Sequence, residues 1–249
     1  MTREILGIDV GGSSVKAALV DVDTGQVSGT PLSAPTPRPS TPAALTTVIA
    51  GLAARLPGTG GRVGVAFPSV IKNGIAHTAA NIDASWIGTN GETLAAGALG
   101  RPVQFLNDAD AAGIAEMRFG SGRGCSGTVV MLTFGTGIGT ALFTGGRLFP
   151  NAELGHMELR GMDAEKWASA HVRTAQRLDF PGWIARVNEY LLALHKLLWP
   201  DVFILGGAVS ARYAEFAPLL RAPAELRPAR FTGHAGVIGA ALAAAEAGS

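Results

Sequence analysis

The N-terminal third of the chain alternates short apolar blocks with turns rich in glycine or proline. Blocks of this length, bounded by turn residues, are typical of β-strands. Thr41 and Pro42 then favour the start of a helix, because a threonine oxygen caps backbone amides and proline has no amide to leave unpaired. We therefore predict strands at 5–10, 15–22, 26–33 and 64–67, a hairpin at 70–77 and a helix at 43–56.

The rest of the chain places amphipathic segments between fully apolar blocks, which are typical of strands buried on both faces. Strands that alternate with helices indicate an α/β fold of two lobes. We expect a small N-terminal lobe at 1–105 and a larger lobe at 106–231, with the C-terminal helix at 232–249 packed on the first lobe. We predict strands at 103–106, 129–134 and 201–205, and helices at 109–119, at 181–198, after Gly207 and from Gly236 onward.

One pattern occurs twice, at 8–20 and at 132–143. Each copy is an apolar strand, a glycine-rich turn with small hydroxyl residues and a second apolar strand. Such a turn can point backbone N–H groups at an anion, because no Cβ blocks the approach. We therefore predict that the two hairpins grip a chain of phosphates from both sides, although either one alone has the alternative of an ordinary tight turn. The predicted phosphate-binding residues are Asp9, Gly11, Gly12, Ser13, Ser14, Lys16, Thr133, Gly135, Thr136 and Gly137.

Composition narrows the classes of function. The 20 Lys and Arg residues against 19 Asp and Glu give a net charge of +1, which argues against a general nucleic-acid binder. The single cysteine, Cys125, excludes an internal disulfide and a cysteine-only metal site. We see no signal-peptide pattern and no long apolar run, so we expect a cytoplasmic protein with no membrane partner.

Asp9 suits a Mg²⁺ ion that bridges phosphates, whereas Lys16 is either a donor contact or a strand lysine facing water.

Five segments together resemble the sugar-kinase, Hsp70 and actin superfamily, and within it the ROK family of sugar kinases. Residues 9–14 and 133–139 resemble its two phosphate motifs, and 204–207 resemble its nucleoside motif. Asn107-Asp108 lies between the phosphate motifs, as in ROK kinases, and Glu153-Leu154-Gly155-His156 matches their Glu-x-Gly-His sugar motif. The resemblance covers essentially the whole chain and implies a two-lobed, actin-like ATPase fold with duplicated glycine-rich β-hairpins.

The same resemblance implies roles for single residues. Asp108 would accept the proton of the sugar hydroxyl, and its alternative role is to cap the helix that follows. For the other sugar contacts the alternatives are a solvated turn at Gly155 and an exposed helical charge at Glu165. Trp86 either stacks on the substrate or anchors its loop. The implied sugar-binding residues are Asn81, Asn107, Asp108, Glu153, His156 and Glu165, and the implied nucleoside contacts are Gly206 and Gly207.

Within the family, the chain looks most like polyphosphate glucokinases and polyphosphate/ATP glucomannokinases. Residues 78–86 resemble their signature loop, and 106–113 and 150–153 are also similar. Like them, the chain lacks the cysteine-rich zinc motif of many ROK proteins, so His156 has no thiolate co-ligands and we expect no structural zinc. One departure is Ser69, where ROK proteins typically have glycine.

These implications predict an enzyme that transfers a phosphoryl group from inorganic polyphosphate, with ATP as a further donor, to the 6-hydroxyl of glucose, with Mg²⁺ as cofactor. One alternative is a mainly ATP-dependent glucokinase or glucomannokinase of the same family. Another is a non-catalytic sugar-binding ROK protein, against which Asp9 and Asp108 both count. Relatives are often homodimers, and the resemblance implies the same here. The basic residues that we consider for the path of a polyanion are Lys72, Arg118, Arg123 and Arg147.

Overall fold

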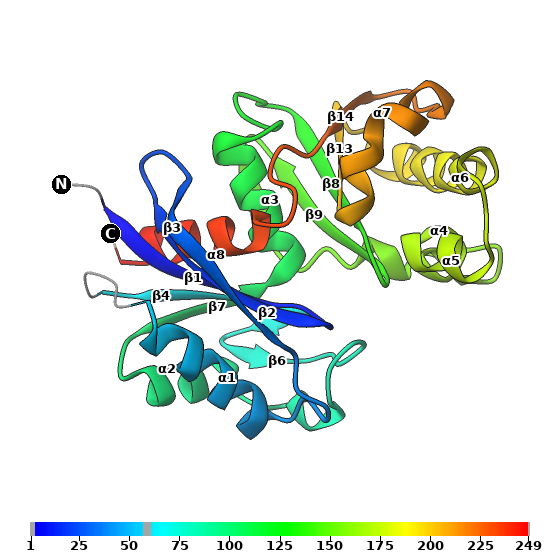
Figure 1. Ribbon diagram of the computed structural model, residues 1–249. Helices are drawn as coiled ribbons and strands as arrows, with labels where there is room; N and C mark the ends of the chain where they lie inside the picture. The colour runs from blue at the N-terminus through cyan, green and yellow to red at the C-terminus, as the bar shows by residue number, and fades with distance from the viewer. Residues whose placement is uncertain (1–2, 57–60, 249) are drawn as a thin grey trace. The chain divides into compact units, whose positions relative to one another are not determined.

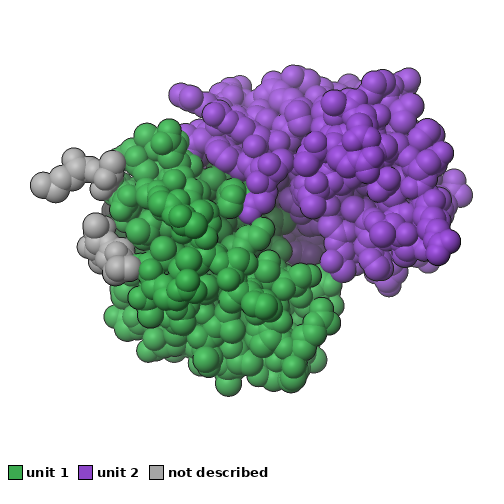
Figure 2. Space-filling view, in the orientation of Figure 1, with its two compact units in different colours: residues 1–115, 234–249 green, residues 116–233 purple. Residues whose placement is uncertain are grey.

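The computed structural model describes residues 3–56 and 61–248. Within it the chain forms two compact units, coloured separately in Figure 2. Unit 2 is one continuous stretch inserted into the sequence of unit 1. Unit 1 comprises Met1–Ala115 and His234–Ser249, and unit 2 comprises Glu116–Gly233.

The chain leaves unit 1 inside helix α3 (Asp108–Phe119), later than the boundary at residue 105 that we expected. The reason is that the first turns of α3 pack against the C-terminal helix α8 (Ala235–Glu246). A Cβ on Gly239 of α8 would lie only 1.6 Å from the carbonyl oxygen of Ala111, so the two helix backbones touch there. The start of α3 therefore belongs to unit 1.

Unit 1 is built on a five-stranded sheet in the order β3-β2-β1-β4-β7 (Figure 1). The first three strands form an antiparallel meander, and the other two run parallel to β1. Because the hairpin between β1 and β2 turns directly at a glycine pair, the predicted first phosphate turn lies at one end of this sheet. The strands are β1 (Glu4–Val10), β2 (Ser14–Asp21), β3 (Gln26–Pro35), β4 (Val63–Phe67) and β7 (Val103–Asn107).

Helices cover both faces of this sheet (Figure 1). On one face lies α8, whose backbone packs so closely that a Cβ on Gly64 of β4 would lie 1.8 Å from the carbonyl oxygen of Ala240. On the other face, apolar side chains of β1 form a core with Leu45 and Ile49 of α1 (Pro42–Ala54), beside α2 (Gly91–Leu99). The predicted cap of α1 is confirmed, since the hydroxyl of Thr41 accepts a hydrogen bond from the amide of Ala44 at 3.4 Å.

Unit 2 repeats the same sheet layout in the order β10-β9-β8-β13-β14. Its first three strands are again an antiparallel meander, and β13 and β14 again run parallel to the strand before the hairpin. The pattern that occurs twice in the sequence thus corresponds to a repeated topology. The strands are β8 (Thr128–Phe134), β9 (Ile138–Thr144), β10 (Arg147–Phe149), β13 (Val202–Gly206) and β14 (Glu225–Pro228).

The long helix α6 (Phe180–Leu198) provides the core of unit 2. Its residues Trp183, Val187 and Leu191 are fully buried with side chains of β8 and β13. After Gly207, where we predicted a helix, a 3₁₀ turn at Ala208–Arg212 leads into one turn of α7 (Tyr213–Phe216).

Short elements complete the two units. Their bounds are β5 (Ile71–Lys72) and β6 (Ile75–Ala76) in unit 1, and β11 (Glu158–Leu159), β12 (Met162–Asp163), α4 (Ala164–Ala168) and α5 (Ala170–Ala175) in unit 2. The turn between β5 and β6 is the predicted one at Asn73-Gly74, and both residues have positive φ. Among the described helices, none combines the length and the apolar composition that a membrane span needs.

Candidate active-site residues

The first glycine turn is held in shape by its own backbone and by the loop after β3. The amide of Gly11 donates to the carbonyl of Ser14 at 2.9 Å, which closes the turn. Thr36 then binds it twice: its amide donates to the carbonyl of Ser13 at 3.1 Å, and its hydroxyl donates to the carbonyl of Gly11 at 2.6 Å. The turn is therefore preorganised before any anion binds.

Asp9 lies at the base of this turn, opposite Lys16 in the β1–β2 register. The first turn of α8 approaches so closely that a Cβ on Gly236 would lie 2.6 Å from the carboxylate carbon of Asp9. Burial raises the pKa of Asp9, and the charge of Lys16 opposes that rise. The carboxylate of Asp9 is a hard oxygen donor of the kind that Mg²⁺ prefers. The chemistry of this side chain therefore fits a magnesium ion.

The second glycine turn packs against the predicted nucleoside motif. The amide of Gly135 donates to the carbonyl of Gly137 at 3.0 Å, so Thr136 stands at the tip. Gly207 has φ +85, and a Cβ there would lie 2.2 Å from the carbonyl oxygen of Phe134. Only glycine satisfies both conditions, so the turn after β13 lies directly against the start of the hairpin.

Two predicted sugar-binding segments meet at Ile138, the first residue after this turn. A Cβ on Gly155 would lie 2.2 Å from the carbonyl oxygen of Ile138, so the Glu-x-Gly-His segment packs on it backbone to backbone. From the other side, the amide of Ile138 donates to a carboxylate oxygen of Glu165 at 3.2 Å. The alternative of a purely exposed helical charge is therefore wrong for Glu165. Within unit 2, the predicted sugar residues therefore pack directly against the predicted phosphate turn.

His156 lies between two carboxylates. Its Nε2 is 3.7 Å from Glu153 Oε2, and its Nδ1 is 3.8 Å from Asp163 Oδ2. Burial raises the pKa of Glu153, His156 lowers it and the charge of Glu165 raises it. Asp163 also binds Lys166 at 2.9 Å, and hydrogen bonds from that lysine keep the pKa of Asp163 low.

Asp163 is a residue that the sequence reading missed. The tight β11–β12 hairpin brings Asp163 back beside His156, and its turn at Arg160-Gly161 has positive φ at both positions. The Arg-Gly pair in the sequence was the available signal for this hairpin. His156, Asp163 and Glu165 offer ligand atoms within 4.8 Å of one another, so they are also close enough to share a cation. The expectation of no structural zinc stays a prediction.

In unit 1, Asn107 has structural contacts of its own. Its Oδ1 accepts the amides of Ala109 at 2.8 Å and Asp110 at 3.0 Å, and its Nδ2 donates to the carbonyl of Ser69 at 3.0 Å. Asn107 therefore caps α3. Asp108 lies in the first helical turn, where its Oδ1 also accepts the amide of Ala109 at 2.8 Å. The roles of Asn107 as a sugar ligand and of Asp108 as a base stay predictions.

Ser69 explains how the signature loop is held. Its hydroxyl donates to the carbonyl of Thr78 at 2.8 Å and accepts the amide of the same residue at 3.1 Å, contacts that glycine cannot make. At the other end of the loop, Trp86 is 1% exposed, packs 4.4 Å from the ring of Phe67, and donates its Nε1 hydrogen to the carbonyl of Ser40 at 2.9 Å. Trp86 is thus a loop anchor and does not stack on substrate.

A polar pocket of about 260 Å³ brings two groups of predicted residues together in unit 1. Gly12 of the first turn and Asn81 of the signature loop both line it, together with Arg38, which the sequence reading did not select. Of the predicted polyanion contacts, Lys72 lies on β5 in unit 1, whereas Arg118, Arg123 and Arg147 lie in unit 2. Their convergence on one path stays a prediction.

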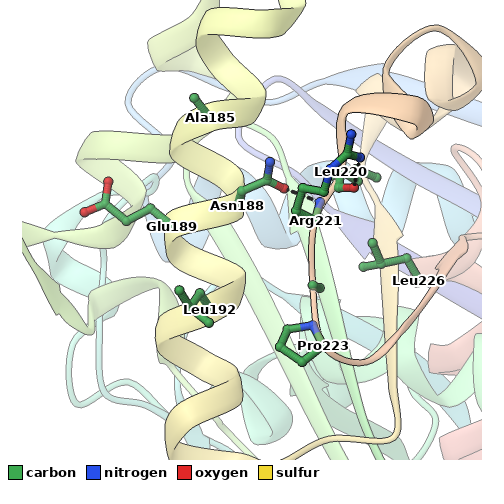
Figure 3. A pocket seen from close by; sticks show the side chains of 9 residues that line it. Ala185, Asn188, Glu189, Leu192, Leu220, Arg221, Pro223 and Leu226 are labelled. Carbon is green, nitrogen blue, oxygen red and sulfur yellow. Dashed lines mark hydrogen bonds between the residues drawn. The ribbon is translucent and has the colours of Figure 1, made fainter.

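A larger apolar cavity of about 750 Å³ lies in unit 2, between α6 and the segment that leads into β14 (Figure 3). Asn188 bridges its walls, since its side chain binds the carbonyl of Leu219 at 3.0 Å and the amide of Arg221 at 2.7 Å. Leu192 and Leu226 line it, and none of the predicted sugar or phosphate residues does. We therefore do not assign the proposed chemistry to this cavity.

Comparison with known proteins agrees with this arrangement. A model of the ROK family matches residues 5–175. Polyphosphate glucokinase from Mycobacterium tuberculosis is 45% identical over 242 residues, which are 97% of this chain and 91% of that protein. Polyphosphate glucokinase from Mycobacterium leprae is 42% identical over 238 residues, which are 95% of this chain and 73% of that protein. The crystal structure of inorganic polyphosphate/ATP-glucomannokinase from Arthrobacter sp. strain KM is similar with a TM-score of 0.94 and 42% identity, over 98% of this chain and 99% of that chain.

Proposed function

Because the chain belongs to the ROK family and has the actin-like ATPase fold of its sugar kinases, we propose that it transfers a phosphoryl group from inorganic polyphosphate to the 6-hydroxyl of glucose. The observation that carries this proposal is the similarity, over nearly the whole chain, to polyphosphate glucokinases from two mycobacteria. The two glycine hairpins agree with it, because phosphoryl transfer depends on positioning and on neutralising charge.

In this mechanism Asp108 accepts the proton of the glucose 6-hydroxyl. The sugar oxygen forms a bond to the terminal phosphorus of the donor, and its proton passes to the carboxylate of Asp108. The bond between that phosphorus and the bridging oxygen breaks, and the shortened polyphosphate leaves with the electron pair. A positioned base contributes roughly 10²–10⁴-fold to such a step. Asn107 supports it by capping α3, which fixes the backbone on which Asp108 stands.

The other hydroxyls of glucose need partners, because each polar group left unpaired on burial costs about 1–3 kcal/mol. In unit 2, Glu153, His156 and Glu165 offer such partners beside the second glycine turn. In unit 1, both polar atoms of the Asn107 side chain already have protein partners, so we propose Asn81 as the asparagine that contacts the sugar.

A phosphoryl-transfer enzyme of this kind uses a divalent cation, and we assign Mg²⁺ to the carboxylate of Asp9. When bound, the ion supplies positive charge to the phosphate oxygens. The backbone amides of the two turns and Lys16 supply the rest of the positive field around the donor.

A parallel kinetic assay tests the function. Purified protein receives glucose or mannose with either polyphosphate or ATP at matched magnesium, and the 6-phosphate of the sugar supplied is measured. We expect a higher kcat/KM with polyphosphate than with ATP. If ATP is the better donor by about tenfold or more, the chain is instead an ATP-dependent hexokinase on the same scaffold. Activity with mannose decides between a glucokinase and a glucomannokinase.

We extend the proposal to a homodimer, located in the cytoplasm. Leu192 and Leu197 in the second half of α6 and Trp199 directly after it are 43%, 66% and 74% exposed, and such apolar side chains provide surface for a second copy. Sedimentation velocity over a range of concentrations measures the oligomeric state, and fractionation of the source cells measures the location.

A further inference from the structure

The loop that follows β3 is fixed at both ends. At its start, Thr36 is 8% exposed and binds the first glycine turn through its amide and its hydroxyl. At its end, the hydroxyl of Ser40 accepts the amide of Asp83 at 3.0 Å, and its carbonyl accepts the indole hydrogen of Trp86 at 2.9 Å. Arg38 stands between these two fixed points, flanked by prolines that restrict the backbone. Its position relative to the glycine turn is therefore set by the fold.

Arg38 lines the polar pocket of about 260 Å³ together with Gly12, Asn81 and Asp83. It is the one cation among the residues that line this pocket. Within residues 3–56 and 61–248, no carboxylate lies within ion-pair distance of its guanidinium. The guanidinium of Arg38 is thus exposed beside a phosphate-type turn and forms no ion pair with a carboxylate of the described residues.

One backbone group of the pocket offers a second donor to an anion. Within the same described ranges, the amide of Gly12 donates to no protein acceptor. Asp83 also lines the pocket and keeps its negative charge, and its Oδ1 accepts the amide of Ser85 at 2.9 Å and the hydroxyl of Ser85 at 2.5 Å. A guanidinium offers a planar fork of donors that matches two oxygens of one phosphate group.

We propose that this pocket binds a phosphate group of the donor, held by the guanidinium of Arg38 and the amide of Gly12. The inference rests on the proposed function and adds a donor-binding residue to it. Because the contact is with one phosphate close to the glycine turn, Arg38 acts on a short condensed phosphate and on a long one alike. Glucose carries no anionic group to pair with the guanidinium, so we expect the effect of Arg38 to fall on condensed phosphate and not on glucose.

The test is a calorimetric titration of the full-length protein with sodium tripolyphosphate and, separately, with long-chain polyphosphate, glucose and glucose 6-phosphate. The variants are Arg38→Gln and Arg38→Lys, with Arg55→Gln as the matched control. Arg55 is an exposed cation of unit 1 at the C-terminal end of α1, and it does not line the pocket. Thermal unfolding of each variant checks that the fold is intact.

For Arg38→Gln we expect about a tenfold or greater loss of affinity for tripolyphosphate and a similar loss for the long polymer. The plot of log affinity against log salt concentration should become less steep by about the amount that one phosphate contact contributes, by analogy with other polyanion sites. Arg38→Lys should lose less, since it keeps the charge and loses only the fork. Arg55→Gln and the affinity for glucose should be unchanged.

The inference is overturned if Arg38→Gln binds tripolyphosphate as Arg55→Gln does. It is equally overturned if the loss is confined to glucose, to glucose 6-phosphate or to the long polymer. The kinetic assay on the unchanged protein tests the proposed function independently of this titration. If neither donor supports glucose phosphorylation, the proposed function is refuted, and the titration still decides whether Arg38 binds condensed phosphate.

Discussion

Glu165 accepts a hydrogen bond at 3.2 Å from the backbone amide of Ile138, which is the first residue after the second glycine turn. A residue predicted to contact the sugar is thereby fixed to the turn predicted to contact the donor. Within unit 2, the spacing between the predicted sugar contact and the predicted donor turn therefore depends on this one hydrogen bond. A change in either residue should alter the binding of both substrates.

A methyl group at Gly137 tests this coupling. A Cβ there would lie 2.1 Å from a carboxylate oxygen of Glu165, so Gly137→Ala must displace that side chain. We expect kcat/KM for glucose to fall by about tenfold or more and the melting temperature to drop. Gly135→Ala is the steric control, because a Cβ at Gly135 meets nothing within 4 Å. A melting temperature that falls equally in both variants would contradict the contact with Glu165.

Asp108→Asn removes the proposed proton acceptor and keeps the shape of the side chain. We expect kcat to drop by roughly 10²–10⁴-fold, with a smaller change in glucose affinity. Steady-state kinetics and a glucose titration measure the two effects separately. A variant that keeps more than half of the kcat would show that Asp108 serves only the first turn of α3.

Asn107→Ala should act mainly on stability. The change removes the acceptor for two amides at the start of α3 and leaves the carbonyl of Ser69 without its amide donor. We expect the free energy of unfolding to fall by about 1–3 kcal/mol, as measured by urea denaturation. Asn107→Asp keeps the capping oxygen, so it should recover part of this loss. No recovery would mean that the contact with Ser69 matters more than the cap.

Asp9→Asn should make the protein more stable at neutral pH and less active. Burial raises the pKa of Asp9, so the folded protein keeps this proton to a higher pH than the unfolded chain does. The unfolding free energy therefore falls as the pH rises from the unfolded pKa through the folded pKa, and above that window the ionised carboxylate destabilises the fold. Asparagine removes this penalty together with the proposed magnesium ligand.

Thermal unfolding without added metal, measured at several pH values, checks that prediction. The difference between Asp9→Asn and the unchanged protein should be largest at neutral pH and should shrink toward acid pH, where the native carboxyl is protonated. Magnesium-dependent activity should be lost in the variant. A variant that is less stable at neutral pH would show that the ionised carboxylate makes net favourable contacts.

Local sequence signals predicted much of this fold. Apolar blocks bounded by glycine turns located the strands, Thr41 and Pro42 located the start of α1, and Asn73-Gly74 located a hairpin. These features depend on residues close together in the chain. The duplicated hairpins were visible for the same reason, and the repeated sheet order confirms the α/β architecture.

Other features depend on residues that meet only in the folded chain. Ser69 looked like a departure from the family, yet its hydroxyl binds both backbone groups of Thr78. Arg38 had no local signal, because its importance comes from a loop that Thr36 attaches to the first glycine turn. A single sequence does not show such proximities, so these residues required the structure.

The contact between α8 and the sheet of unit 1 has a consequence for biosynthesis. A ribosome completes all of unit 2 before it makes α8, because residues 116–233 precede His234. Until then Gly7 and Gly64 expose the sheet face on which α8 packs. Unit 2 is therefore able to fold on the nascent chain, whereas unit 1 reaches its native state only after its last helix has emerged. Premature termination before α8 would yield a chain with one finished unit and one aggregation-prone unit.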